Sequence, residues 1–140
     1  MDEAAQTEEE DFPGRLLHQA ALWDNAELLE DLLHGDQIAH INSQDSWGRT
    51  PLHAAATNVK SRCLPVLLRA GANPNISCGP RDESRTALHV SAVHGHVSNI
   101  LQLLRHHADL TATDRHGQTA RDLAEKGGHH DAMAVLKEAA

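Results

Sequence analysis

Short apolar stretches at helical spacing recur along this 140-residue chain, and polar stretches rich in Gly, Asn, Asp and Ser separate them. Near the middle, Leu64, Leu67 and Leu68 follow the i, i+3, i+4 spacing of one helix face. Gly71 comes next, at a position where a left-handed residue commonly ends a helix. The pattern predicts pairs of short helices, with polar turn-forming loops between the pairs.

The same pattern returns every 33 to 36 residues. Residues 50–53 read TPLH, residues 86–89 read TALH and residues 119–122 read TARD, while residues 16–18 read LLH as a degenerate first copy. A dipeptide that closes the second helix recurs at one fixed offset: Leu32-Leu33, Leu67-Leu68, Leu103-Leu104 and Leu136-Lys137. An internal repeat of this length is typical of a stacked array.

The residues at the start of each copy are suited to beginning a helix. The Thr50 hydroxyl can cap a helix N-terminus, and Pro51 fits the first helical position because its missing N–H would have no partner there. Ala55 and Ala56 leave a narrow apolar face that lets neighbouring helices approach closely. A single copy cannot bury its apolar face, so stability requires at least about three stacked copies.

These repeated residues resemble the ankyrin-repeat family, whose signature is TPLH followed by Ala at a spacing of about 33 residues. The resemblance covers residues 15–139 and implies an all-α ankyrin solenoid of four stacked helix-turn-helix units with β-hairpin finger loops. We expect repeats at about residues 13–44, 45–80, 81–113 and 114–140, preceded by an acidic disordered tail at residues 1–12.

Copy two departs from the family pattern. Val59-Lys60 replaces the usual Gly-His, and Pro65 falls early in the second helix. We predict that Ser61 caps this helix late, which leaves Pro65 near the first turn and the helix delayed or slightly bent.

Two finger loops are also three residues longer than the third. The interval from Gly35 to Thr50 and the interval from Gly71 to Thr86 are both 15 residues, against 12 from His107 to Thr119. Extra loop residues cost little entropy, so the extensions are either neutral or additional contact surface.

Charge argues against a nucleic-acid partner. The net charge is -8, and six of the acids lie in the first twelve residues, so the rest of the chain holds 14 acids against 12 bases. Phosphate binding needs a clustered basic excess, which is absent here. The acidic tail is interpreted as a solubilising leader or as an autoinhibitory or partner-contacting arm.

No pattern in the chain predicts catalysis, a metal or a cofactor. Cys63 and Cys78 lack metal-ligand spacing and are consistent with a reducing compartment. There is no phosphate-binding loop and no nucleophile motif, so we expect a non-enzymatic protein. The resemblance assigns five of the twelve histidines to positions where the ring bonds loops between units: His18, His53, His89, His96 and His129. No apolar run is long enough for membrane insertion, and we expect a cytoplasmic or nuclear protein.

In ankyrin-repeat proteins, partners are usually held by the finger tips and the exposed ends of the first helices. Carried onto this chain, the resemblance implies the following partner-binding residues: Trp23, Ser46, Trp47, Arg49, Asn58, Glu83, Arg85, His94, Arg115, His116 and Lys126.

Both tryptophans of the chain fall in that set, and Trp and Arg are enriched at binding hot spots. The alternative is structural: Trp47 packs on the next finger and Trp23 lies under copy two. The basic members of the set favour a partner segment that carries carboxylates flanked by apolar residues.

The resemblance also implies a modification. Asn42 and Asn75 occupy the finger position that oxygen-dependent asparaginyl hydroxylases modify in many ankyrin proteins. The alternative is that these side chains only close the hairpins.

The leading interpretation is therefore an adaptor that binds a protein or peptide as a monomer. The alternative is a direct inhibitor of a partner enzyme, because the chain resembles the four-repeat inhibitors of cyclin-dependent kinases in length and last repeat. Those inhibitors tend to have an irregular second repeat, and the complete TPLH of copy two argues mildly against this alternative. A purely structural spacer is a third option.

Overall fold

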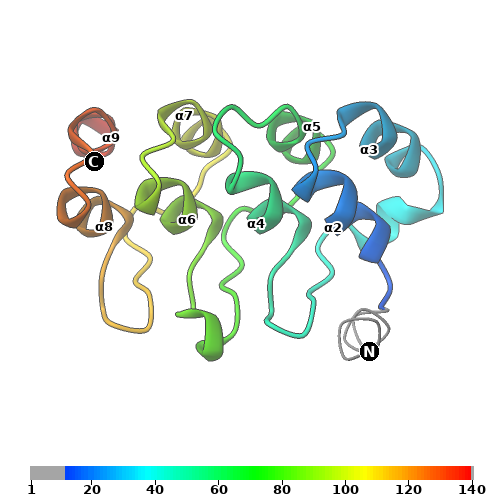
Figure 1. Cartoon of the computed structure of the whole chain (residues 1–140), viewed down its shortest axis with the longest axis horizontal. Coiled ribbons are helices and arrows are strands. Elements are labelled where there is room, and N and C mark those ends of the chain that lie inside the picture. Colours follow the sequence, from blue (N-terminus) through cyan, green and yellow to red (C-terminus); the bar gives the residue numbers. More distant parts are fainter. Residues whose placement is uncertain (1–11, 140) are drawn as a thin grey trace.

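The computed structural model describes residues 12–139, which form two parallel rows of helices (Figure 1). The eight α-helices of this part of the chain alternate between the rows: α2 (Arg15–Leu22), α3 (Ala26–Leu33), α4 (Pro51–Ala56), α5 (Cys63–Arg69), α6 (Ala87–Val93), α7 (Val97–Arg105), α8 (Ala120–Lys126) and α9 (His130–Ala139). The even-numbered helices form one row and the odd-numbered helices the other (Figure 1). The all-α ankyrin solenoid expected from the repeats is confirmed. The expected acidic tail lies outside the described residues, apart from its last position.

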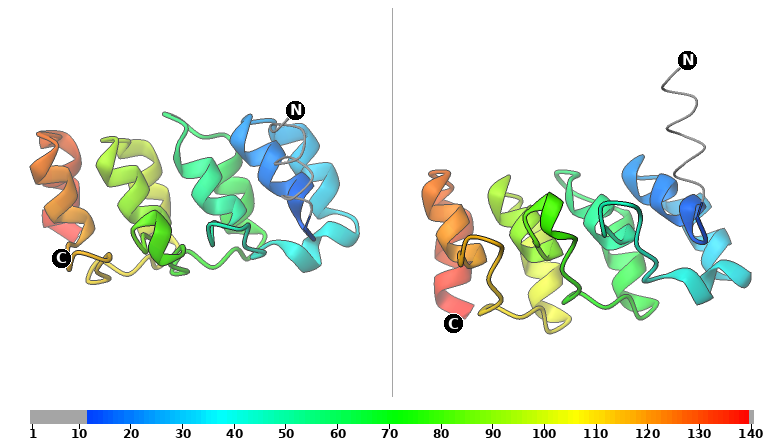
Figure 2. Two further views of the ribbon diagram at one scale, coloured as in Figure 1. Left: turned by 60° about the horizontal axis from the view of Figure 1, so that its bottom comes forward. Right: turned by 90° about the horizontal axis from the view of Figure 1, so that it is seen from below.

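Long loops, here called fingers, leave the row of first helices on one side (Figure 1) and run along one edge of the stack (Figure 2). Short-range backbone hydrogen bonds close each tip. In the first finger, the Asp45 N–H donates to the Arg49 carbonyl at 2.9 Å and the Gly48 N–H donates to the Asp45 carbonyl at 2.9 Å. Such turn bonds do not make a ladder, and residues 12–139 contain no strand. The fingers are therefore hairpin-like turns rather than paired strands.

The core is a continuous line of small and medium aliphatic side chains through all four repeats. Alanines on the first helices, such as Ala20, Ala55 and Ala92, are fully buried and allow close approach between neighbours. The largest buried aliphatic side chains are Leu17, Leu29, Leu52, Leu64, Leu67, Leu88, Ile100, Leu103 and Leu136. Because no large ring fills this core, stability depends on stacking between repeats.

Threonine caps begin three of the first helices as predicted. Thr50 Oγ1 accepts from the His53 N–H, and the same reciprocal box recurs at Thr86 and Thr119. In the first two boxes the third helical residue is histidine, whose Nδ1 accepts from the threonine N–H at 3.1 Å. An Nδ1 that accepts a hydrogen bond fixes the tautomer with hydrogen on Nε2.

That Nε2 ties each first helix to the following finger. His53 Nε2 donates to the Arg85 carbonyl at 2.8 Å, and His89 Nε2 donates to the Gln118 carbonyl at 3.0 Å. His18 makes the matching contact with the Ser43 carbonyl at 2.9 Å. Burial lowers the pKa of His53 and of His89, so both rings are neutral near pH 7. Three of the five histidine positions inferred from the resemblance thus hold the fingers in place, whereas His96 and His129 contact the carbonyls at the ends of α4 and α6, Ala56 at 3.4 Å and Val93 at 2.8 Å.

The second repeat is the irregular one and has the shortest first and second helices of the described array. Ser61 Oγ accepts from the Leu64 N–H at 2.9 Å, so the predicted late cap is confirmed. Asp24 from repeat one adds a second cap, accepting from Arg62 N–H at 2.8 Å and Cys63 N–H at 3.2 Å. Neighbouring repeats therefore complete what the second repeat lacks.

The three extra residues of the two long fingers take different forms. In the first finger they make a 3-10 helix, η1 (Asp36–His40), which follows α3 and lies away from the tip (Figure 1). In the second finger they extend the tip itself as η2 (Pro80–Asp82). Only the second extension adds surface to the finger tips.

Candidate functional site

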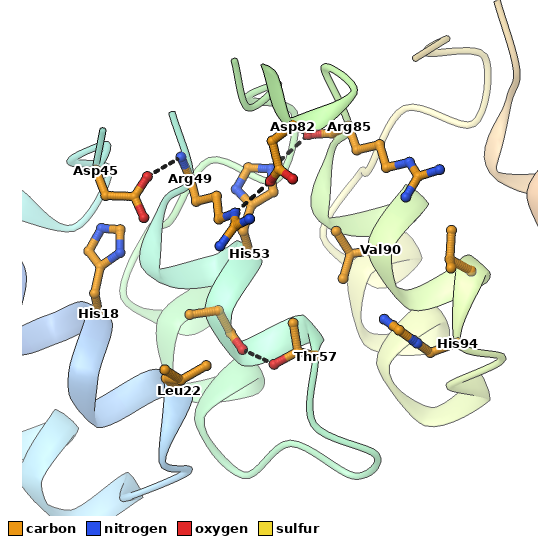
Figure 3. A pocket seen from close by; sticks show the side chains of 12 residues that line it. His18, Leu22, Asp45, Arg49, His53, Thr57, Asp82, Arg85, Val90 and His94 are labelled. Atoms are coloured by element: carbon orange, nitrogen blue, oxygen red, sulfur yellow. Dashed lines mark hydrogen bonds and ion pairs between the residues drawn. The ribbon is translucent and has the colours of Figure 1, made fainter. Parts of the chain in front are cut away.

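A hollow of about 320 Å³ lies between the first helices and the finger bases, and we call it the central groove (Figure 3). Repeats one to three contribute to it through α2, α4, α6 and two fingers. The central groove is lined by His18, Leu22, Asp45, Arg49, His53, Ala54, Thr57, Asp82, Arg85, Val90, Val93 and His94.

The finger side of the central groove carries charged side chains (Figure 3). Arg49 Nε donates to Asp82 Oδ2 at 2.5 Å and so joins the first finger to the second. This hydrogen bond raises the pKa of Arg49 and lowers the pKa of Asp82. The charge of Arg49, predicted to face a partner, is therefore largely used within the protein.

Arg85 has a different arrangement. Its Nε lies 3.8 Å from Asp114 Oδ2, which is close enough for charge attraction but too long for a hydrogen bond. Burial by itself raises the pKa of Asp114, but hydrogen bonds from the Gln118 and His116 N–H groups, with nearby His89 and Arg85, outweigh it and hold that pKa below its ordinary value. Asp114 is thus an ionised, buried carboxylate beside Arg85.

Apolar side chains make the opposite part of the central groove. Leu22, Ala54, Val90 and Val93 come from three first helices whose groove-facing positions align through stacking. His94 closes one end, and burial, followed by the neighbouring rings of His96 and His129, lowers its pKa. The groove therefore offers an apolar floor beside a charged wall.

The tips of the first two fingers contact one another, and we call this surface, which includes Ser46, Trp47, Gly79 and Arg81, the finger platform. The Arg81 guanidinium lies 4.7 Å from the Trp47 ring centroid, and that of Arg49 lies 5.5 Å from it. The Gly79 N–H donates to the Trp47 carbonyl at 2.8 Å. Trp47 packs on the next finger, as the structural alternative expected, yet 38% of its surface remains exposed. Its role in binding a partner stays a prediction.

Trp23 lies at the opposite edge, where the loops between helices gather. It is 67% exposed, as is Val59 from the next repeat. Asn58 Nδ2 donates to the carbonyls of Ala21 (3.1 Å) and Leu22 (3.3 Å), which fixes the Val59 loop against the end of α2. At this exposure Trp23 is not wedged under copy two, and it follows Leu22 of the apolar floor in the chain.

A second hollow of about 340 Å³, the C-terminal hollow, adjoins the central groove. It is lined by Glu83, Arg85, Val93, His116, Gln118, Leu123, Lys126 and Gly127. His116 Nε2 contacts Glu83 Oε1 at 2.5 Å, so these two predicted residues meet across neighbouring fingers. Arg115 Nη1 donates to the Pro80 carbonyl at 3.3 Å.

The residues predicted from the repeats thus fall into neighbouring groups. Arg49, Arg85 and His94 line the central groove. Ser46 and Trp47 belong to the finger platform, while Glu83, His116 and Lys126 line the C-terminal hollow. Leu22 and Val93 of the floor lie at the ends of first helices, where the repeats predicted exposed surface, but sequence reasoning missed Ala54, Val90 and the Trp47 neighbour Arg81. Helical spacing could have identified Val90, because it lies three residues before Val93 on α6.

The two asparagines singled out for modification connect adjacent fingers. Asn42 Oδ1 accepts from the Asn73 N–H at 2.9 Å, and Asn75 Oδ1 accepts from the Asp109 N–H at 2.7 Å. Each bond joins one repeat to the next rather than closing its own hairpin.

Neither cysteine has the features of a reactive thiol, and no metal cluster is found among the described residues. Burial, followed by nearby Asp24, raises the pKa of the Cys63 thiol to about 12, and burial also raises the pKa of Cys78. Within residues 12–139 no three His, Cys, Asp or Glu side chains are grouped to hold a metal ion. No helix in this part of the chain has the length and apolar character that a bilayer crossing requires.

Comparison with known families gives a match to a model described as ankyrin repeats (3 copies), over residues 17–114 and 60–140. Together these matches cover most of the chain.

Similar curated proteins differ widely in size and role. The chain is 29% identical over 130 residues to transient receptor potential cation channel subfamily A member 1 of Homo sapiens and 32% identical over 112 residues to tyrosine-protein kinase Shark of Drosophila melanogaster. It covers 11% and 12% of their lengths, with 91% and 80% of its own residues aligned. It is also 31% identical over 131 residues to cyclin-dependent kinase inhibitor 2A of Monodelphis domestica, covering 93% of this chain and 73% of that protein.

Proposed function

This chain belongs to the ankyrin-repeat family, and from that premise we propose that it is a non-enzymatic adaptor that binds a partner protein along the central groove and the finger platform. The observation that carries the proposal is the central groove itself. It combines side chains from three repeats into one hollow of about 320 Å³ with an apolar floor and a charged wall. Such a surface suits an extended or helical segment of another protein better than a small substrate.

The finger platform supports the same proposal. Trp47 is held by Arg81 and by the backbone of the second finger, so little side-chain entropy is lost when a partner covers it. Rigid, half-exposed aromatic side chains beside arginine are typical hot spots. We expect Trp47 to provide the main anchor outside the groove.

The test begins with affinity capture from cell lysate and identification of the bound protein, which is then purified. Calorimetry compares its dissociation constant for the wild-type chain, for the double variant Trp47→Ala/Arg49→Ala and for the control Leu101→Ala/Arg105→Ala. The control removes an exposed apolar–arginine pair from the other row of helices. Binding that is abolished only in the Trp47/Arg49 variant, with unchanged helical circular dichroism, supports the proposal. Equal binding by all three proteins rejects this surface.

A second candidate is direct inhibition of a protein kinase. It is favoured by the relative named as a cyclin-dependent kinase inhibitor, which aligns with 93% of this chain. The complete TPLH argued mildly against it, but the short α4 and α5 make the second repeat irregular in three dimensions. A phosphorylation assay over a panel of cyclin-dependent kinases decides between the two candidates. Loss of kinase activity at micromolar concentrations of this protein supports inhibition, and unchanged kinase activity supports the adaptor function.

We also propose hydroxylation of Asn42 and Asn75 by an oxygen-dependent asparaginyl hydroxylase. Both side chains are exposed on the finger edge, where an enzyme can reach them. Mass spectrometry of the chain isolated from cells tests this directly, because modification adds one oxygen atom to the peptide. Unmodified asparagine at both positions rejects the proposal. The cytoplasmic or nuclear location and the monomeric state remain predictions.

A further inference from the structure

The central groove and the C-terminal hollow adjoin each other, and we call the surface that they form the concave side. Arg85 lies where the two hollows meet. Arg85 and Val93 line both the central groove and the C-terminal hollow. Figure 3 shows the Arg85 side chain on the finger side, beyond Asp82 and beside the apolar floor at Val90. A partner segment that follows the concave side from one hollow to the other must therefore cross Arg85.

Arg85 also keeps hydrogen-bond donors that nearby arginines have used. Arg49 donates to Asp82, and Arg115 donates to the Pro80 carbonyl. The Arg85 guanidinium makes no hydrogen bond within residues 12–139, and its Nε and Asp114 Oδ2 are both buried without such a partner. Asp114 thus orients the guanidinium by charge and leaves its outer N–H groups available. The outer N–H groups of a planar guanidinium match the two oxygens of a carboxylate.

The carboxylates around Arg85 are already engaged. Asp82 accepts from Arg49, and Glu83 contacts His116. Asp114 accepts two backbone hydrogen bonds through Oδ1. Lys126, in the adjoining hollow, has no ion pair within the described part of the chain. Arg85 and Lys126 therefore keep cationic hydrogen-bond donors at the junction of the two hollows, and these donors are complementary to a carboxylate even though Asp114 balances part of the charge of Arg85.

Apolar surface lies on both sides of that charge. Ala54 and Val90 line the central groove on one side, and Leu123 lines the C-terminal hollow on the other. We propose that Arg85 is the specificity-determining residue of the concave side, and that its occupant is a partner segment with one Asp or Glu side chain between two apolar side chains. The carboxylate binds the outer guanidinium N–H groups, and its apolar neighbours occupy the two hollows. This inference rests on the proposed function, because it uses the same concave side.

A carboxylate fits this position better than a phosphate. A phosphate carries close to two negative charges and is usually held by several cations. Here Asp114 already balances part of the charge of Arg85, and Lys126 adds one further cation. Asp82 and Glu83 flank Arg85 on the second finger. The occupant is therefore an acidic rather than a phosphorylated segment.

The experiment selects peptides from a random phage-displayed library against the full 140-residue chain. A selected peptide and its version with Gln in place of Glu, or Asn in place of Asp, are then titrated against four proteins. These are the wild-type chain, Arg85→Gln, Arg85→Lys and the matched control Arg105→Gln, which removes an exposed arginine from α7 in the other row of helices. Gln keeps much of the arginine stem and places an amide N–H group on the side of Asp114. Circular dichroism and melting temperature verify that each variant is folded.

We expect the selected peptides to share an acidic residue with apolar neighbours. Neutralising that residue should weaken binding about 10- to 100-fold on the wild-type chain and on Arg105→Gln, in line with a charged hydrogen bond. On Arg85→Gln the same change should cost less than about threefold, because the cation is already gone. Arg85→Lys, which keeps the charge without the fork, should fall between them.

Selected peptides without a carboxylate, an equal loss on wild-type and Arg85→Gln chains, or tighter binding of phosphorylated versions would each overturn the inference. Leu22→Gln separates this failure from failure of the proposed function, because Leu22 is an exposed floor residue of the central groove. If Leu22→Gln weakens peptide binding but Arg85→Gln does not, the role of Arg85 is rejected and the proposed function is retained. Peptides indifferent to both variants, or no selected peptide at all, reject the concave side as the binding surface.

Discussion

Replacing Asn99 by alanine tests how the irregular second repeat is supported. Asn99 is on α7 of repeat three and is 1% exposed. Its Oδ1 accepts from the Ser61 N–H at 3.2 Å, and its Nδ2 donates to the Asn58 carbonyl at 2.6 Å. One side chain therefore satisfies two backbone groups of the α4–α5 loop.

The expected loss follows from those two groups. A buried polar group left without a partner costs about 1–3 kcal/mol. Ser61 is buried, so water cannot replace the bond to its N–H, whereas Asn58 is half-buried and water can partly replace the bond to its carbonyl. We expect Asn99→Ala to lower the free energy of unfolding by about 2–4 kcal/mol, a large share of the roughly 5–15 kcal/mol of a typical domain.

Urea denaturation followed by circular dichroism measures the loss, and hydrogen exchange locates it. The Ser61 amide should exchange faster in the variant than in the wild-type chain. Ser98→Ala is the matched control, because this neighbouring residue on α7 is exposed and should change stability by less than about 0.5 kcal/mol. A loss below about 1 kcal/mol for Asn99→Ala, or unchanged exchange at Ser61, would refute the reasoning.

Three further predictions concern His53, the two cysteines and Gly48. Burial lowers the pKa of His53 below its unfolded value, so the unfolded chain binds more protons than the folded chain below about pH 6.5. The free energy of unfolding should therefore fall from pH 7 to pH 5. The melting temperature of His53→Gln should depend less on pH over this range than that of the wild-type chain. A melting temperature of the wild-type chain that is constant over this range would contradict this. Cys63 and Cys78 should resist alkylation by iodoacetamide at pH 8 until urea unfolds the chain, because burial raises both thiol pKa values. Rapid alkylation of the native protein would contradict this prediction. Gly48→Ala should lower the melting temperature, because Gly48 has φ +81° and an added Cβ would lie 2.4 Å from the backbone nitrogen of Gly79 in the finger platform. A melting temperature within about 1 °C of wild type would count against this packing.

Much of the fold was predictable because the repeat is a local pattern read four times. The threonine caps, the leucines of the second helices and the late cap at Ser61 depend on residues within one helical turn of each other. The histidine contacts were inferred from the resemblance rather than from local spacing. Their tautomer became clear only when the Thr50 and Arg85 contacts were seen together.

The candidate site was predicted less completely. Exposed positions at finger tips could be named from their place in the repeat, and the structure gathers them around two adjoining hollows. Which charges remain available could not be named. Arg49 and Arg85 occupy equivalent positions in the sequence, yet Arg49 is hydrogen-bonded to Asp82 and Arg85 is not hydrogen-bonded to Asp114. That difference depends on distances between neighbouring fingers.

The sequence by itself determined the array: its four units, its capped helices and its aliphatic core, since each follows from spacing within a unit. Tertiary structure alone decided where the extra finger residues lie, which repeat supports the Ser61 loop, and which arginine can still bind a partner. The physical reason is that those features depend on contacts between residues about 30 to 40 positions apart. Stacking brings such residues together, and no local pattern records the distances between them.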